Sequence, residues 1–72
     1  MISDPVVARR VSDLMLDVGA RLDESIREVA RSSPAEAEDY KRAVGAVMAD
    51  ILLDVLNPLY RMHPDMKPAE LK

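Results

Sequence analysis

Four aspartates are the residues whose spacing first suggests chemistry. Asp13 and Asp17 are four residues apart, and Asp50 and Asp54 repeat that spacing further along the chain. Residues four apart share one face of a helix, so each pair would present two carboxylates side by side. Hard divalent cations take oxygen ligands of this kind. The four side chains are therefore a candidate divalent-metal site, provided that two helices bring the pairs to one height.

A solvated, charged edge is the favoured interpretation of the same aspartates. Metal sites inside helical bundles use inward-facing Glu residues with a Glu-x-x-His motif, and this sequence has no such motif. Arg9, Arg10 and Arg21 are spaced to reach the carboxylates. We therefore expect no metal and no cofactor.

His63, Tyr40 and Tyr60 are the other side chains with chemical potential. His63 lies among prolines, and helical spacing places no Ser, Cys or Asp beside it. A general base needs a positioned partner and a pocket, so we expect His63 to lie at the surface or to dock the tail. The tyrosines are expected to close the two ends of a bundle, with rings inward and hydroxyls toward water. No catalytic residue is predicted, and the chain is not expected to be an enzyme.

Length and composition favour a small helical domain that needs a partner. The 72 residues are 49% hydrophobic and 32% charged, with two tyrosines as the only aromatics and no cysteine. Such a mixture suits amphipathic helices better than strands. One core of this size supplies only ~3–5 kcal/mol of net stability, so small chains need staples. Without disulfides, oligomerisation is the expected stabiliser.

Charge and hydropathy exclude several other classes of protein. The formal net charge is −3, and no run is basic enough to predict nucleic-acid binding. The most apolar run, residues 46–56, contains Asp50 and Asp54 and is too short to span a bilayer. The start of the chain lacks the basic and apolar segments of a signal peptide. We expect a cytoplasmic protein that binds neither nucleic acid nor membrane.

Two helices and one tight turn position these residues, in a single domain spanning residues 1–72. Asp4 is an N-cap residue and Pro5 suits the first helical position. Apolar residues then recur at helical spacing through residues 5–31. The chain breaks at Ser32-Ser33, where Ser33 and Glu36 form a capping-box sequence before the second helix. The two apolar stripes are Val7, Val11, Leu14, Val18, Leu22, Ile26 and Val29, and then Ala37, Tyr40, Val44, Val47, Met48, Ile51 and Val55.

The second helix is expected over residues 34–62, with a kink or a break at 57–58. Pro58 removes a backbone donor and clashes with the preceding turn. We favour the kink, because Leu59 and Met62 stay in phase with the stripe. Residues 63–72 contain two prolines and predict an extended tail, with a last turn possible at 69–72. The short turn makes the helices antiparallel. The predicted fold is all-α, a two-helix hairpin.

Projection of both helices at ~100° per residue gives the hairpin two unlike edges. The charged edge would pair Arg10 with Asp54, which share a height; its members are Arg10, Asp17, Arg21, Asp50, Asp54 and Arg61. Leu16 and Leu53 are expected to point away from both the core and the apolar edge. That apolar edge is a candidate oligomer interface, made of Ala8, Met15, Gly19, Leu22, Ile26, Gly45, Met48, Leu52, Leu56 and Leu59.

A second copy related by a two-fold axis is the simplest cover for this apolar edge. The result would be a homodimer in the form of a four-helix bundle. The function expected is that of a protein–protein interaction or regulatory module. A different protein is the alternative partner, as for a small chaperone, antitoxin or immunity protein. A divalent-metal-binding protein that uses the four aspartates is the third hypothesis.

Overall fold

The first long helix begins where Asp4 caps it. One carboxylate oxygen of Asp4 accepts hydrogen bonds from the backbone N–H groups of Val6, at 2.8 Å, and Val7, at 3.4 Å. Pro5 occupies the first helical position, where a missing N–H costs nothing. In the computed structural model, which describes residues 1–69, helix α1 spans Pro5–Ser32. The cap and the bounds agree with the sequence prediction to within one residue.

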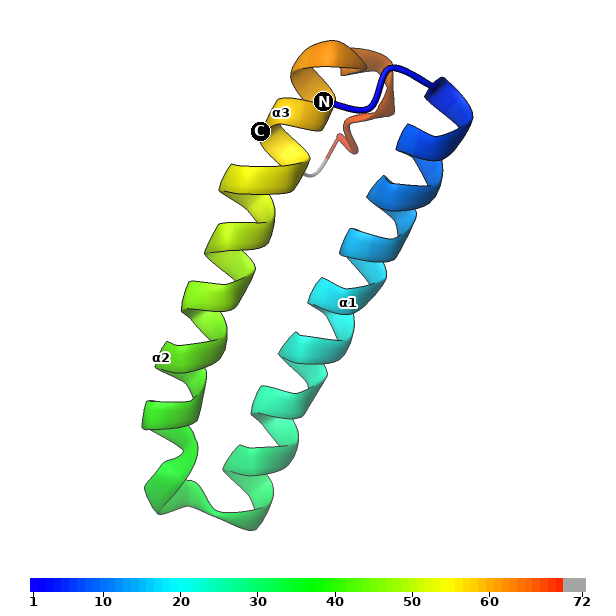
Figure 1. The fold of residues 1–72 in the computed structure, drawn as a ribbon. Helices are drawn as coiled ribbons and strands as arrows, with labels where there is room; N and C mark the ends of the chain where they lie inside the picture. Colours follow the sequence, from blue (N-terminus) through cyan, green and yellow to red (C-terminus); the bar gives the residue numbers. More distant parts are fainter. Residues whose placement is uncertain (70–72) are drawn as a thin grey trace.

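One residue, Ser33, connects α1 to helix α2, which spans Pro34–Asp50. The Ser33 N–H closes α1 on the carbonyl of Val29 at 2.7 Å, and its carbonyl accepts from the N–H of Glu36 at 2.9 Å. The predicted capping box is wrong, because the Ser33 side chain makes no capping hydrogen bond. Ser33 serves both helices and has a ψ of 71°, outside the extended range usual for an N-cap. The one-residue connection makes the helices antiparallel (Figure 1).

The second helix passes Pro58 without ending. After α2 the chain continues as a π-helix, η1 (Ile51–Leu56), and then as α3 (Asn57–Met62). Pro58 has no N–H to give to Asp54, and its ring crowds that carbonyl. The chain adapts by widening: the Asn57 N–H bonds to the carbonyl of Leu52, five residues back. Of the two expected outcomes, the continuous helix is the one observed.

The π-helix changes which residues of α3 face α1. A turn closed by bonds between residues five apart holds one residue more than an α-turn, so the chain beyond it is rotated by ~100°. Met62 would face the core in a straight helix, yet it is 48% exposed. Helical projection alone would turn Tyr60 away, yet it is only 4% exposed, which agrees with the inward ring predicted for it. The predicted inward phase of Met62 is therefore wrong, and Tyr60 takes its place.

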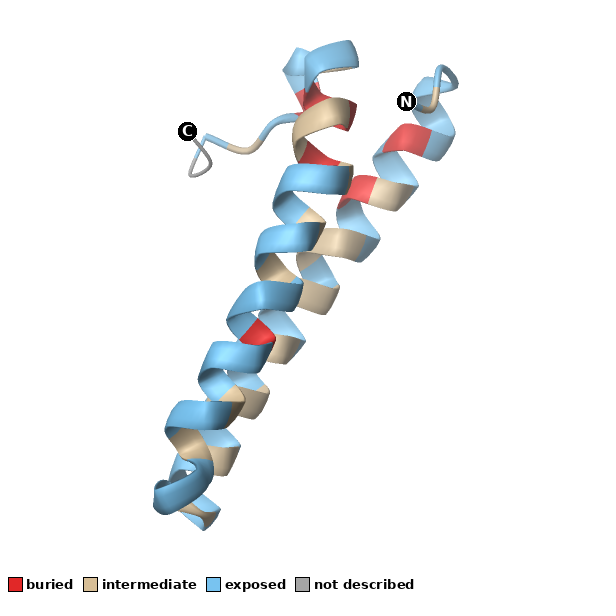
Figure 2. Cartoon of the chain, turned by 60° about the vertical axis from the view of Figure 1, so that its left-hand side comes forward, coloured by how far each residue is buried: buried red, intermediate tan, exposed pale blue. Residues whose placement is uncertain are grey.

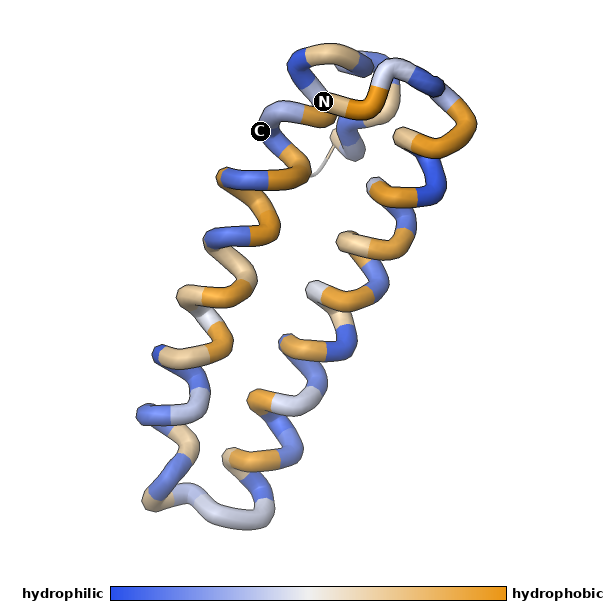
Figure 3. The backbone as a smooth tube through the Cα atoms, viewed as in Figure 1, coloured by the Kyte–Doolittle hydropathy of each residue, from blue (hydrophilic) through white to orange (hydrophobic). Residues whose placement is uncertain are grey.

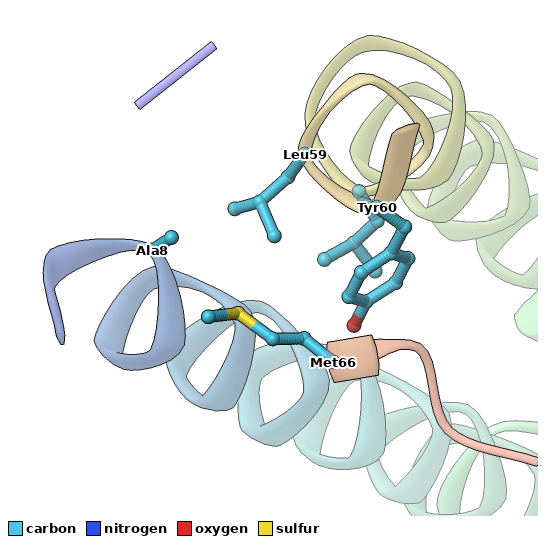
Figure 4. Close-up of a cluster of buried hydrophobic side chains, with 5 residues drawn as sticks. Ala8, Leu59, Tyr60 and Met66 are labelled. Carbon is cyan, nitrogen blue, oxygen red and sulfur yellow. The ribbon is translucent and has the colours of Figure 1, made fainter. Parts of the chain in front are cut away.

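The core lies at the open end of the hairpin, where the first residues of the chain lie beside α3 (Figure 1). Its buried members are Ala8, Leu56, Leu59, Tyr60 and Met66. Met66 belongs to a short 3₁₀ helix, η2 (Pro64–Met66), and its side chain reaches back toward the helix that carries Ala8 (Figure 4). The prediction of a wholly extended tail is wrong, because η2 folds onto this core. The last turn expected at 69–72 lies mostly outside the described residues.

Toward the turn, the hairpin is two helices with little between them. The molecule measures 44 × 19 × 16 Å, and within residues 1–69 the only buried hydrophobic residue outside the open-end cluster is Val44. Exposed residues dominate most of α2 (Figure 2). Apolar residues nevertheless continue along both helices (Figure 3). Leu14 and Val47, which the stripes place toward the core, are both exposed. No strand occurs in residues 1–69.

Candidate interaction surface

An open apolar groove runs between α1 and the second helix near the middle of the hairpin. Its volume is about 480 Å³. Asp23 is the only charged residue along it. The lining residues are Met15, Leu16, Gly19, Ala20 and Asp23 from α1, with Met48, Ala49, Ile51, Leu52 and Leu56 from α2 and η1. A groove of this kind offers apolar contact area and no reactive group.

Gly19 lies in this groove although nothing within the hairpin requires a glycine there. A Cβ built on Gly19 would meet no atom within 4 Å, and its φ is not positive. Glycine inside a helix costs about 1 kcal/mol relative to alanine. Its effect within this chain is to leave the groove one side chain wider. The packing of the single chain does not offset that cost.

The predicted apolar edge is only partly an exposed surface. Met15, Gly19, Met48, Leu52 and Leu56 line the groove. Leu22 and Ile26 are half-buried along α1, and Gly45 is exposed outside the groove.

Ala8 and Leu59 are both 0% exposed and belong to the hairpin's own core, so their placement on an exposed edge is wrong. Leu56 is also almost fully buried. Leu56 and Leu59 are buried because the π-helix turns them from the predicted edge toward α1.

Leu16 is one of the groove residues that helical projection did not place on the apolar edge. It was expected to point away from both the core and the edge, yet it lines the groove and packs against the buried cluster. Leu16 precedes Gly19 by three residues and Ala20 by four, a spacing that puts the three on one helix face, and this spacing is the signal that could have found it. Leu53, expected to point outward, is exposed.

Each tyrosine forms a hydrogen bond with a serine across the hairpin. The hydroxyls of Ser12 and Tyr60 are 2.6 Å apart and buried, and those of Ser25 and Tyr40 are 2.7 Å apart. The Ser25 hydroxyl donates to the carbonyl of Leu22 at 2.6 Å. Since a serine has one hydroxyl proton, Tyr40 is the donor to Ser25. The predicted orientation of the tyrosine hydroxyls toward water is therefore wrong. Both hydroxyls link the two helices.

The four aspartates of the candidate metal site do not come together. All four are exposed. Within residues 1–69, no group of three or more His, Cys, Asp or Glu side chains could hold a metal ion. Asp17 pairs with Arg21 on its own helix at 3.1 Å. The described residues show no Arg10–Asp54 ion pair, because each salt bridge found there joins residues three or four apart on one helix.

The charge of Asp23 at the groove is offset by Arg27. Their side chains are 2.9 Å apart, and Arg27 also reaches Glu24 at 3.4 Å. The hydrogen bond from Arg27 to Asp23 is the main cause of a raised pKa for the Arg27 guanidinium. Exposed pairs of this kind contribute little to stability. Their consequence here is a groove whose single carboxylate is already paired.

His63 holds the beginning of the chain. Its Nε2 lies 2.8 Å from the carbonyl oxygen of Ile2. A carbonyl can only accept, so Nε2 carries the proton in this bond. Ile2 has a φ of 57°, which is an outlier for a β-branched residue and persists only where neighbours enforce it. His63 thus ties down the N-terminal segment.

The second helix is long and apolar, and little of it is covered. The continuous helix Pro34–Met62 has 29 residues, and its most apolar window has a mean hydropathy of 1.4 with 22% of that window buried. By length and composition alone, such a helix could cross a membrane; the core helix of a globular protein passes the same test. For the candidate surface, the relevant finding is that only 22% of this apolar window is buried within the chain.

Comparison with known proteins found no family model, no curated protein and no solved structure that matches this chain. The groove and the helices that form it therefore carry the functional argument.

Proposed function

We propose that this chain is a protein–protein interaction module that works as a homodimer, with two hairpins packed into a four-helix bundle. The observation that carries the proposal is the excess of exposed surface. The chain exposes 5154 Å². The scaling of surface with mass gives about 4,450 Å² for a compact monomer of this size. The hairpin therefore exposes about 700 Å² more than a compact monomer would.

That excess matches what one partner contributes to a stable interface. Standard protein–protein interfaces take roughly 800 Å² from each side. The apolar window of the second helix, of which little is buried, and the apolar groove support the proposal, because both leave apolar surface uncovered. A two-fold pair of hairpins buries the same face of each copy. Binding is the activity proposed, in the cytoplasm, with no reaction catalysed.

Light scattering and sedimentation equilibrium over a wide concentration range test this proposal. The expected result is a mass twice that of the 8.0 kDa chain. Leu52→Asp should shift the equilibrium to monomer, because it places a charge in the groove. Leu14→Asp is the matched control, since Leu14 is also exposed but does not line the groove. A wild-type chain that is fully helical and monomeric at every concentration would contradict the proposal.

A hairpin that folds onto a different protein is the second candidate. The observation in its favour is the small core, which holds six buried hydrophobic residues among those described. A chain with so little burial can be unfolded until a partner arrives. Circular dichroism of the isolated chain separates the two: a signal that stays that of an unfolded chain at every concentration favours a different partner. Flotation with neutral vesicles is a control for the apolar helix, and we expect the chain to stay in the aqueous fraction.

A further inference from the structure

A hollow and a protruding side chain lie on the same side of the second helix. Ala49 lines the groove. Leu53 follows it by four residues and is 59% exposed, and residues four apart are neighbours on one helix face. On the α1 side the groove is shallow at Gly19 and Ala20, because Gly19 has no side chain and Ala20 has only one methyl group. One surface therefore presents both a cavity and a side chain of the kind that fills cavities.

We propose that a second copy occupies this groove and that Leu53 of each copy seats over Gly19 and Ala20 of the other. This inference rests on the proposed function and specifies the contact within it. A two-fold axis that crosses the face between Leu53 and Gly19 brings each leucine to the other copy's hollow. Isologous interfaces require such self-complementary surfaces. The small residues let the two backbones approach closely.

A second copy fits this groove for three reasons. The excess exposed area of about 700 Å² is close to one partner's share of a standard interface. The only charged residue of the groove, Asp23, is paired with Arg27 at 2.9 Å, so a second acidic chain meets no unpaired carboxylate there. A second copy would also explain the glycine at position 19, because a glycine lets another backbone approach closely, which offsets its unfavourable helix propensity.

Substitutions at Leu53 and Gly19 should weaken the dimer without unfolding the hairpin. Leu53→Ala removes an exposed side chain from each copy and should raise the dimer Kd about tenfold or more. Gly19→Leu fills the hollow and should have a similar effect. A Cβ at Gly19 meets nothing within 4 Å in its own chain, and leucine is a better helix former than glycine, so helix content should be kept or raised.

Matched controls are available on the far side of each helix. Leu14→Ala removes an equally exposed leucine, and Ala43→Leu adds the same bulk at an exposed position. Neither residue lines the groove, and both variants should dimerise like the wild type. The double variant Gly19→Leu with Leu53→Ala should be no weaker than Gly19→Leu alone, because residues in contact give non-additive effects.

Disulfide trapping tests the contact directly, because the chain has no cysteine of its own. Ala20→Cys chains mixed with Leu53→Cys chains should form the mixed disulfide faster than either forms a disulfide with itself. A wild-type chain that is monomeric would overturn both this inference and the proposed function. A wild-type dimer that tolerates Leu53→Ala and Gly19→Leu, and gives no preference for the mixed disulfide, would overturn this inference alone.

Discussion

Ser12 and Tyr60 share a buried hydrogen bond of 2.6 Å between their hydroxyl groups, although they are 48 residues apart in the chain. The bond joins α1 to α3 next to the open-end core. It forms because the π-helix turns Tyr60 inward and because α1 presents a serine at the buried position that follows Ala8 by one turn. A polar contact of this kind fixes the alignment of two helices more strictly than apolar packing alone.

Tyr60→Phe should destabilise the fold by about 1–2 kcal/mol, because it leaves the buried Ser12 hydroxyl without its partner. Tyr40→Phe should cost less, since its bond to Ser25 is only part-buried. Urea unfolding followed by circular dichroism, at one fixed protein concentration, measures both. Equal losses for the two variants would show that burial does not set the value of these bonds.

Leu59→Ala should cost about 2–5 kcal/mol, the range for a fully buried leucine. Leu59 is 0% exposed, and a small core supplies only ~3–5 kcal/mol in total. The variant is therefore expected to be largely unfolded, seen as a loss of helical signal. Leu14→Ala, at an exposed position, is the control and should stay folded. A folded Leu59→Ala chain with an unchanged melting temperature would mean that the open-end cluster is not the core.

Pro58→Ala should relax the π-helix, because it restores a backbone N–H that can bond to the carbonyl of Asp54. The helix beyond it would then rotate back by ~100°. We expect Tyr60 to become accessible to solvent and Met62 to become buried. The loss of nuclear Overhauser contacts between Tyr60 and Ser12 would report this rotation. Persistence of those contacts would show that packing of Tyr60 holds the π-helix and that Pro58 is not its cause.

His63→Ala should free the N-terminal segment, since it removes the donor to the Ile2 carbonyl. We expect faster amide hydrogen exchange at residues 2–7 and a loss of about 0.5–1.5 kcal/mol. His63→Gln keeps an N–H donor and should retain part of the protection. Exchange rates unchanged in the alanine variant would mean that the Ile2 side chain alone holds the segment in place.

The local sequence determined where the helices begin and how they are connected. Asp4 with Pro5, and Pro34 after Ser33, act over three or four residues, so their effect does not depend on the rest of the fold. The apolar spacing of three and four residues predicts helices for the same reason. The hairpin and the antiparallel arrangement could therefore be predicted, whereas a kink and a break at Pro58 both stayed open.

Only the tertiary structure decided which residues face each other. A widened turn at Ile51–Leu56 changes the phase of every later residue, and a projection at constant angle cannot include it. Leu59 and Tyr60 both face the core, Met62 is exposed, and Met66 packs onto the core from a segment predicted to be extended. The groove keeps half of the predicted edge, including Gly19 and Leu52. Helical periodicity carries no information about a widened turn, so the phase of the residues beyond it was decided only in the folded chain, where they pack against α1.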